Sequence, residues 1–361
     1  MRSRLGFPTC SHLASSNRSL RCVGGLARLQ STSSLSPAPS HDQHLTETKQ
    51  SSHIKTVEGQ IDIDSYRKFA SNPLLLKRYH NLPASQKWFR FATKNSYTTF
   101  TKYMKAYQDV ILSYEFTAPC PSHADESTSE GQVLTEFLNW LRSSSEYQES
   151  YLPLLVESII QSTDISDSPG STLNFQQFEA PLSLIVAACQ FNGTKPNPAE
   201  QIKQLYVAQS DLSHLPKHLF QDLHMPDIVK YAGKGDIYGS SIWLGLQPTY
   251  TPLHRDPNPN LFCQLVSSKR IRLIAPDRGD EIYARIRRAL GSHGNSRFRG
   301  AEMMEGRERN LLHHAVWDDD AVDEVSLDPG DALSIPKGWW HSVASNGQDG
   351  AINASVNWWF R

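Results

Sequence analysis

A turn-forming motif near the C-terminus constrains this chain more than any other feature. Gly, five residues, Pro, one residue, Gly, two residues and His follow one another at Gly330, Pro336, Gly338 and His341. The Pro and Gly predict a turn that brings His341 back across a barrel towards an earlier strand. Because four residues of three types must fall in register, the motif is specific. The alternative is that His341 is a core histidine beside Trp339 and Trp340.

An earlier His-x-Asp pair supplies two further metal-binding side chains. On a strand, residues two apart point to the same face, so His254 and Asp256 can both project into a barrel. His123 and Asp125 have the same spacing but lie in an acidic loop, where a solvated histidine is expected. Only the first pair is completed by His341, which predicts a metal site of His254, Asp256 and His341.

The number of ligands indicates the metal chemistry. Barrels with His-x-His and a later Glu fill four positions and suit isomerases and decarboxylases. Two histidines and one carboxylate leave three positions open, which an iron oxygenase needs for a bidentate oxo-acid and O2. The sequence therefore favours Fe(II).

Lys269 is a candidate anion-binding residue. Strand alternation places it on the apolar side with Ile271 and Leu273, whereas Arg270 and Arg272 face the other way. An inward lysine is costly unless a carboxylate neutralises it. The alternative is that Lys269 escapes to solvent at the Ser267-Ser268 turn.

The last strand also has a polar face. Asn353, Ser355, Asn357 and Trp359 alternate with apolar residues. Because this strand follows the metal motif closely, its polar face is expected to line a binding site. The alternative is an open sheet, in which this face would be exposed to water.

Short apolar runs dominate the chain after Asp236. They cover 237–244, 261–266, 271–274, 332–335, 342–344 and 352–360. Such spacing predicts a mainly β fold, a jelly-roll or double-stranded β-helix, behind a helical N-terminal buttress. We expect one domain over 59–361, with a helical part at 59–235 and a jelly-roll core at 236–361. Asp64 is expected to cap a short helix through Phe69 and Ala70. Further helices are expected over 132–141 and through most of 197–223, with loops at 119–131 and 162–171.

These motifs together resemble the JmjC, cupin-like hydroxylases. The resemblance rests on Thr-Pro-Leu-His-x-Asp-Pro, on Asn-Leu-x-x-Gln-x-x-x-x-Lys-Arg, on Ile-Pro-x-x-Trp-Trp-His and on Ser-Val-Asn-x-Trp. Tyr206-Val-Ala-Gln209 resembles a further family motif. The similarity runs from about residue 60 to the end and is closest to the asparaginyl hydroxylase that inhibits the hypoxia factor and to the JmjC arginyl hydroxylase.

The resemblance implies a role for each matching residue. His254, Asp256 and His341 would bind Fe(II), with 2-oxoglutarate and O2 as cosubstrates. Lys269, Thr251 and Tyr206 would hold the distal carboxylate of 2-oxoglutarate. Two asparagines, Asn260 and Asn357, would line that pocket, and Trp359 would lie on the oxygen or substrate side.

The function predicted is therefore a 2-oxoglutarate-dependent dioxygenase that hydroxylates a C–H bond, most simply in a protein side chain. A small-molecule substrate stays open, as do N-methyl-lysine demethylation and a non-catalytic metal-binding scaffold. Between 277 and 325 a basic run precedes an acidic run; these are solvated faces, or the acids contact a basic substrate.

The N-terminus resembles a mitochondrial transit peptide. The first 41 residues hold five Arg, ten Ser, no Lys and no acid. We predict a transit peptide over 1–30, a polar linker over 31–58 and a matrix location; the alternative is a disordered tail without an address. Removing five of 36 basic residues leaves 31 against 37 acidic ones. A net charge of −6 disfavours nucleic acid as a binding partner. No apolar run reaches membrane-spanning length. A monomer or weak dimer is expected.

Overall fold

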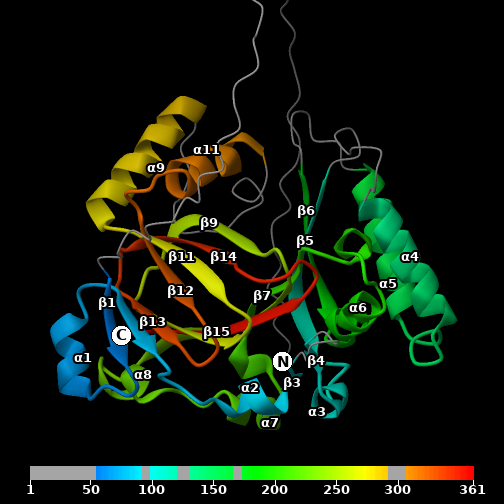
Figure 1. Ribbon diagram of the computed structural model, residues 1–361, viewed down its shortest axis with the longest axis horizontal. Helices are drawn as coiled ribbons and strands as arrows, with labels where there is room; N and C mark the ends of the chain where they lie inside the picture. The colour runs from blue at the N-terminus through cyan, green and yellow to red at the C-terminus, as the bar shows by residue number, and fades with distance from the viewer. Residues whose placement is uncertain (1–53, 92–97, 120–129, 166–172, 292–305) are drawn as a thin grey trace, which may run out of the picture. The chain divides into compact units, whose positions relative to one another are not determined.

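The computed structural model describes residues 54–91, 98–119, 130–165, 173–291 and 306–361. Residues Ser51–Arg361 form one compact unit. At its centre two β-sheets face each other (Figure 1). Their strands are β8 (Ile237–Leu246), β9 (Tyr250–Arg255), β10 (Asn260–Val266), β11 (Lys269–Ile274), β12 (Asp323–Leu327), β13 (Ala332–Ile335), β14 (Trp340–Ser345) and β15 (Ile352–Phe360).

The strand order identifies the core as a double-stranded β-helix. One sheet contains β13-β10-β15-β8 and the other β12-β11-β14-β9, and neighbouring strands within each are antiparallel. Phe262 and Leu333 from the first sheet and Ile271, Leu273 and Val343 from the second form one buried cluster between them. The predicted jelly-roll is therefore confirmed.

Further strands extend the larger sheet at both edges. β1 (Lys55–Glu58) and β2 (Leu74–Lys77) continue it beyond β13, and β7 (Leu205–Asp211), β5 (Ile111–Pro119) and β6 (Leu173–Pro181) continue it beyond β8. β3 (Phe89–Arg90) and β4 (Thr99–Phe100) pair separately. The segment 59–235, predicted as the helical part, therefore contains strands as well as helices, and β1 occupies the end of the segment predicted as a linker. The strand β7 also corrects the mainly helical assignment of 197–223, because its pairing with β5 and β8 is a long-range contact without a local signal.

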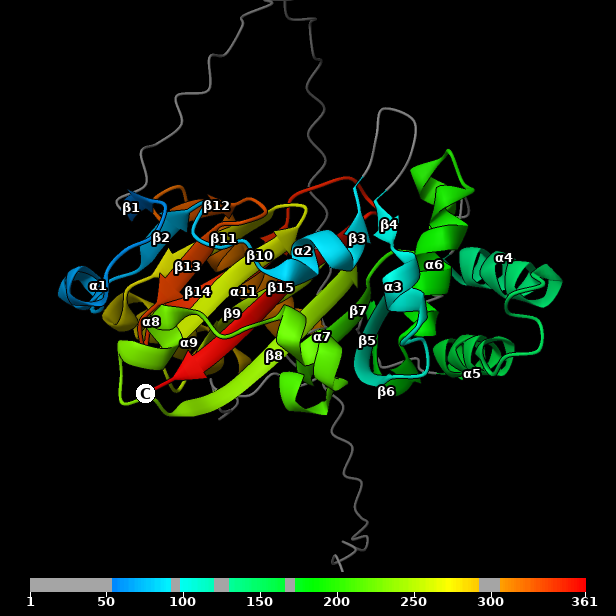
Figure 2. The same ribbon diagram turned by 90° about the horizontal axis from the view of Figure 1, so that it is seen from below.

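The helical buttress lies on the β5–β6 side (Figure 2). There α4 (Glu130–Ser143), α5 (Leu152–Ile165) and α6 (Ser183–Gly193) pack together, and α6 is buried along most of its length. α4 contains the helix predicted at 132–141. α5 extends to Ile165, into the loop predicted at 162–171. Residues 166–171 of that loop, and residues 120–129 of the loop predicted at 119–131, lie outside the described residues.

Shorter helices fill the remaining connections. They are α1 (Ile63–Phe69), α2 (Pro83–Lys87), α3 (Lys102–Lys105), α7 (Lys217–Asp222) and α8 (Asp227–Tyr231), with 3-10 turns at Pro198–Glu200 and Leu212–His214. The N-cap of α1 is Asp62, whose carboxylate accepts from Ser65 N at 2.8 Å, so the Asp64 cap was wrong by two residues. No helix in the described ranges is long and apolar enough to cross a membrane.

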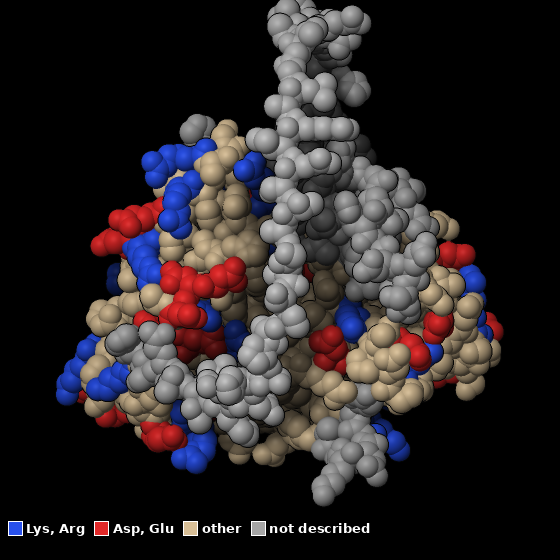
Figure 3. Space-filling model, turned by 45° about the horizontal axis from the view of Figure 1, so that its top comes forward, with Lys and Arg blue, Asp and Glu red and all other residues tan. Residues whose placement is uncertain are grey.

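In the described parts of the charged 277–325 segment, two helices pack against the outer face of the smaller sheet. Ile282 and Ile286 of α9 (Pro276–Leu290) and Leu312 of α11 (Gly306–Trp317) share a buried cluster with Leu253 and Trp340. A Cβ at Gly279 would overlap the Trp340 indole, so this close approach requires glycine. On the face shown in Figure 3, Lys and Arg gather over α9 and acidic residues lie beside them.

Candidate metal centre and adjoining pocket

His254, Asp256 and His341 converge inside the jelly-roll. His341 on β14 is the cross-strand partner of His254 on β9, and their ring centroids lie 4.2 Å apart. The His341 Nε2 atom lies 3.6 Å from Asp256 Oδ2. One ligand atom from each of the three residues can be chosen so that all lie within 4.8 Å of one another. The structure thus brings together the three residues predicted as ligands; His123 and Asp125 lie outside the described residues.

Hydrogen bonds orient these side chains. The Nδ1 atom of His254 contacts Pro252 O at 2.9 Å, and that of His341 contacts Trp339 O at 3.3 Å. In both histidines the carbonyl two residues earlier therefore engages Nδ1, which fixes the ring so that Nε2 is the metal-binding atom. Two such nitrogens and one carboxylate oxygen are the donor set of a facial iron triad, and the residues present fit that metal.

A β-bulge places Thr251 on the same face as His254. His341 and Val343, two residues apart on β14, pair with His254 and Thr251, three residues apart on β9. Val343 belongs to the interior cluster, whereas Leu253 packs outward with α9 and α11. The extra β9 residue therefore lets Thr251 and His254 both face inward. Simple alternation from His254 would place Thr251 outside.

Lys269 points into the interior rather than to solvent. Its side chain is 2 % exposed, and its ammonium donates to Ser355 Oγ at 2.9 Å and to Tyr206 OH at 3.4 Å. On the opposite side of the strand, Arg270 and Arg272 lie over Trp317. The alternation in β11 is as predicted, and the solvent alternative for Lys269 is wrong. A buried ammonium ringed by hydroxyl groups suits a carboxylate ligand.

The polar face of β15 lines this interior. Asn357 Nδ2 donates to Asn260 Oδ1 at 3.0 Å, and Asn260 Nδ2 donates to Asp256 Oδ2 at 2.9 Å. Asn260, Asn357 and Ser355 are buried, so these polar groups do not meet water. The chain of hydrogen bonds links the three-residue cluster to the strand that contacts Lys269.

Ser355, which the alternation of β15 placed on the polar face, had not been assigned a role, and its contact with Lys269 adds it to the site. Trp359 packs against Tyr206, Ala208 and Trp243, beside the Lys269 contact.

Several acidic side chains of the 277–325 segment pair with other residues of the protein. Glu324 pairs with Arg270 and Arg272 at 3.1 and 2.6 Å, and Asp319 pairs with Arg278 at 2.6 Å. His314 contacts Asp318 at 2.7 Å. These contacts favour the surface interpretation of the acidic run over one in which it binds a basic substrate.

Comparison with known proteins agrees with this architecture. Residues 68–361 match the family described as "Cupin-like domain". Jumonji C domain-containing protein 5 of Drosophila melanogaster is 32% identical over 171 residues, which cover 46% of this chain and 39% of that protein. Lysine-specific demethylase JMJ30 of Arabidopsis thaliana is 28% identical over 166 residues, covering 46% and 36%. Lysine-specific demethylase 8 of Danio rerio is 29% identical over 157 residues, covering 43% and 36%.

The chain thus matches well under half the length of these relatives, whereas the family match spans most of the chain and all of the jelly-roll. The sequence motifs, the double-stranded β-helix and this match all indicate the same family. The chain belongs to the cupin-like domain family, of the JmjC type.

Proposed function

We propose that the protein is an Fe(II)- and 2-oxoglutarate-dependent dioxygenase that hydroxylates a C–H bond of a protein side chain. One observation carries this proposal: a cluster of two histidines and a carboxylate shares an interior surface with the buried Lys269. The cluster offers the iron ligands, and Lys269 offers the charge that a dicarboxylate cosubstrate needs.

Each residue then has a defined task. His254, Asp256 and His341 hold the metal, and Asn260 orients Asp256. Lys269, with Tyr206 and Ser355 beside it, holds the distal carboxylate, and Thr251 faces the same interior. When bound, iron, 2-oxoglutarate and O2 supply the oxidising chemistry for hydroxylation. The buried apolar cluster of Phe262, Leu273 and Val343 excludes water from this space.

Turnover of 2-oxoglutarate tests the proposal. The purified protein with Fe(II) should form succinate, and Asp256→Ala should abolish both metal binding and succinate formation. Asp318→Ala is a matched control, because that exposed carboxylate contacts only His314 among the described residues. Full succinate production by Asp256→Ala would refute the assignment of the ligands. Metal binding without any turnover would favour the non-catalytic scaffold.

The names of the Arabidopsis and zebrafish relatives keep lysine demethylation as a second candidate. Both reactions consume 2-oxoglutarate, so succinate does not separate them. Trimethyl-lysine peptides should release formaldehyde if the protein is a demethylase. A hydroxylase should instead leave one added oxygen atom on its substrate. Affinity capture from mitochondrial extract with an inactive His254→Ala protein would supply candidate substrates for the second measurement.

We further propose a mitochondrial matrix location, directed by residues 1–30. Five Arg and no acid in this segment support it, since import depends on a positively charged presequence. These residues lie outside the described part of the chain, so the proposal rests on composition alone.

A further inference from the structure

The backbone ladder between β9 and β14 ends beside the candidate metal ligands. Its last cross-strand pair is Arg255 with Trp340, and the pair before it is His254 with His341. Asp256 lies one position beyond the end of β9. Pairing at strand ends opens most easily, and the bulge on the other side of His341 interrupts the ladder as well. We therefore expect backbone pairing alone to leave these ligands incompletely fixed.

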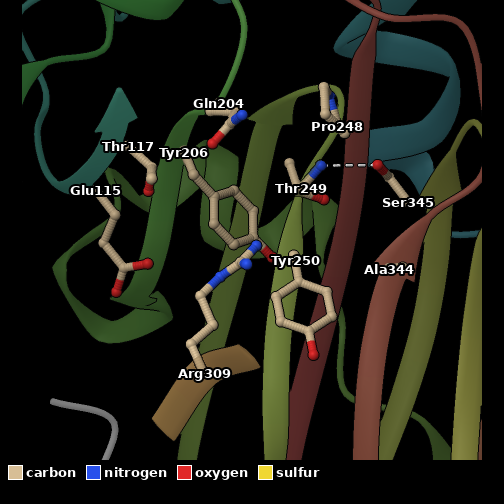
Figure 4. A pocket seen from close by; sticks show the side chains of 10 residues that line it. All are labelled: Glu115, Thr117, Gln204, Tyr206, Pro248, Thr249, Tyr250, Arg309, Ala344 and Ser345. Atoms are coloured by element: carbon tan, nitrogen blue, oxygen red, sulfur yellow. Dashed lines mark hydrogen bonds between the residues drawn. The ribbon is translucent and has the colours of Figure 1, made fainter. Parts of the chain in front are cut away.

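The opposite end of the same strand pair is fastened by direct hydrogen bonds. Thr249 N donates to Ser345 Oγ at 2.8 Å, the bond drawn in Figure 4. Ser345 N in turn donates to Thr249 O at 2.9 Å. At the end that carries the metal ligands, side chains take this role.

One carboxylate oxygen joins the last pair of this ladder to helix α9. Asp280 Oδ1 accepts a hydrogen bond from Arg255 Nη1 at 2.7 Å and another from Trp340 Nε1 at 3.0 Å. The guanidinium carbon of Arg255 lies 5.0 Å from the centroid of the Trp340 ring. Strand alternation turns both side chains outward, since the neighbouring His254 and His341 face inward. Asp280 thus links β9, β14 and α9 on the outer side of the smaller sheet.

The bond to the indole is the stronger part of this arrangement. Trp340 is fully buried, and a buried N–H group that loses its acceptor is costly. The side chain of Asp280 is 52 % exposed, so its ion pair with Arg255 contributes little by itself. A Cβ at Gly279 would overlap the same indole, so α9 packs directly on it. Removing the carboxylate would therefore favour a shift of Trp340.

A shift of either strand end would move the metal ligands. Arg255 stands between His254 and Asp256, and Trp340 directly precedes His341. Each of the three ligands is therefore next in sequence to a side chain that Asp280 holds. A metal site tolerates displacements of its ligands of only about 0.5 Å, so small shifts at these positions are sufficient to weaken it.

We propose that Asp280 is a positioning residue for the metal centre: through Arg255 and Trp340 it sets the spacing of the two ligand-bearing strands and so raises the affinity for the metal. The inference rests on the metal site of the proposed function, and not on the reaction or the substrate. Inside the barrel Asn260 holds Asp256, and Asp280 extends this support to a helix on the outside.

Metal binding by the purified full chain tests this inference. Calorimetry measures the affinity for Mn(II), and the absorption spectrum of bound Co(II) reports the arrangement of its ligands. Asp280→Ala should weaken Mn(II) binding by about tenfold, the lower end of the usual effect of losing a group that supports metal ligands, and should change the Co(II) spectrum. Asp280→Asn should weaken binding less, because its amide oxygen can still accept from Trp340.

Two further variants separate positioning from a general loss of stability. Asp277→Ala is the matched control, since Asp277 is an exposed carboxylate on the same helix and forms no ion pair in the part of the chain that the structure describes. Arg255→Met combined with Asp280→Ala should weaken binding by less than the product of the two single effects, because both substitutions remove the same contact. If Asp280→Ala does not fold, Arg255→Met alone must weaken Mn(II) binding and change the Co(II) spectrum.

The outcomes also distinguish this inference from the oxygenase proposal. A lower melting temperature of Asp280→Ala with an unchanged Mn(II) affinity and Co(II) spectrum would show that Asp280 only supports the fold. The inference would then be wrong, although the metal ligands would stand. If the wild type binds no metal, the inference and the proposed function both fail. If metal binding depends on Asp280 but no succinate forms, the inference stands and the oxygenase proposal fails.

Discussion

Asn260 donates a hydrogen bond from Nδ2 to Asp256 Oδ2 over 2.9 Å, although it lies on β10 of the larger sheet and Asp256 directly follows β9 of the smaller one. The bond therefore spans the two sheets of the jelly-roll at the candidate metal centre. A second bond, from Asn357 Nδ2 to Asn260 Oδ1, fixes the amide of Asn260 in this orientation.

Replacing this orienting amide should weaken metal binding without removing a ligand. We expect Asn260→Ala to lower the affinity for Fe(II) or Mn(II) by about ten- to a hundredfold, the usual effect of losing a partner of a metal ligand. Asn353→Ala is the control, because that buried amide bonds to Gln264 and Ser268 and not to Asp256. Calorimetric titration with Mn(II) measures both. Equal affinities would mean that Asp256 does not depend on Asn260 for its position.

Lys269→Ala should raise the requirement for 2-oxoglutarate far more than it affects the metal. Losing a desolvated charge pair costs on the order of a hundredfold in affinity. The control is Arg270→Ala, since Arg270 faces outward, pairs with Glu324 and lies over Trp317. Succinate formation against 2-oxoglutarate concentration is the measurement. An unchanged dependence on 2-oxoglutarate concentration would mean that another cation binds the distal carboxylate of 2-oxoglutarate.

Gly279→Ala should destabilise the packing of α9 on the smaller sheet. The added methyl group would overlap Trp340, and forcing extra volume into a packed core costs about 1–3 kcal/mol. Gly193→Ala provides the comparison, because a Cβ there meets nothing within 4 Å. Urea denaturation should show a lower midpoint for Gly279→Ala only. Identical midpoints would show that the indole moves aside without cost.

Stability should fall as the pH is lowered from about 6.5 to about 4 because of His80. Burial lowers the pKa of His80 to about 4 in the folded protein, whereas the unfolded chain has the ordinary value near 6.5. Between these values the unfolded state binds more protons, so the contribution of His80 is present above pH 6.5 and is lost on acidification.

The effect should amount to roughly 2–3 kcal/mol at most. The free energy of unfolding of the wild type, minus that of His80→Gln, measured from pH 4 to pH 7, isolates this residue. A difference that does not change with pH would show that His80 titrates normally.

Residues 1–45 should carry a fluorescent protein into mitochondria, because their basic, acid-free composition is that of an import signal. Changing the five arginines to glutamine in the same fusion should leave it in the cytosol. N-terminal sequencing of the native protein should find a cut near Gln30-Ser31. Cytosolic or nuclear fluorescence from the unchanged fusion would argue for the disordered-tail alternative and would make the demethylase candidate more attractive.

The sequence alone determined the parts of this protein that depend on local geometry. The spacing from Gly330 to His341, the His254–Asp256 pair and the inward parity of Lys269 could all be read from it. A strand alternates with a period of two, and a turn needs Pro and Gly at particular positions. These features can therefore be predicted without knowing which residues distant in the sequence lie nearby.

Only the tertiary structure decided what depends on pairing between distant segments. The β9 bulge turns Thr251 inward, and it exists only in register with β14. Strand β7 forms through contacts with β5 and β8 inside a segment whose local pattern favoured helix. Ser355 meets Lys269, and Asp280 meets Trp340, because separate strands and helices meet in space. Local propensities differ by only about 1 kcal/mol per residue, so burial and long-range hydrogen bonding override them.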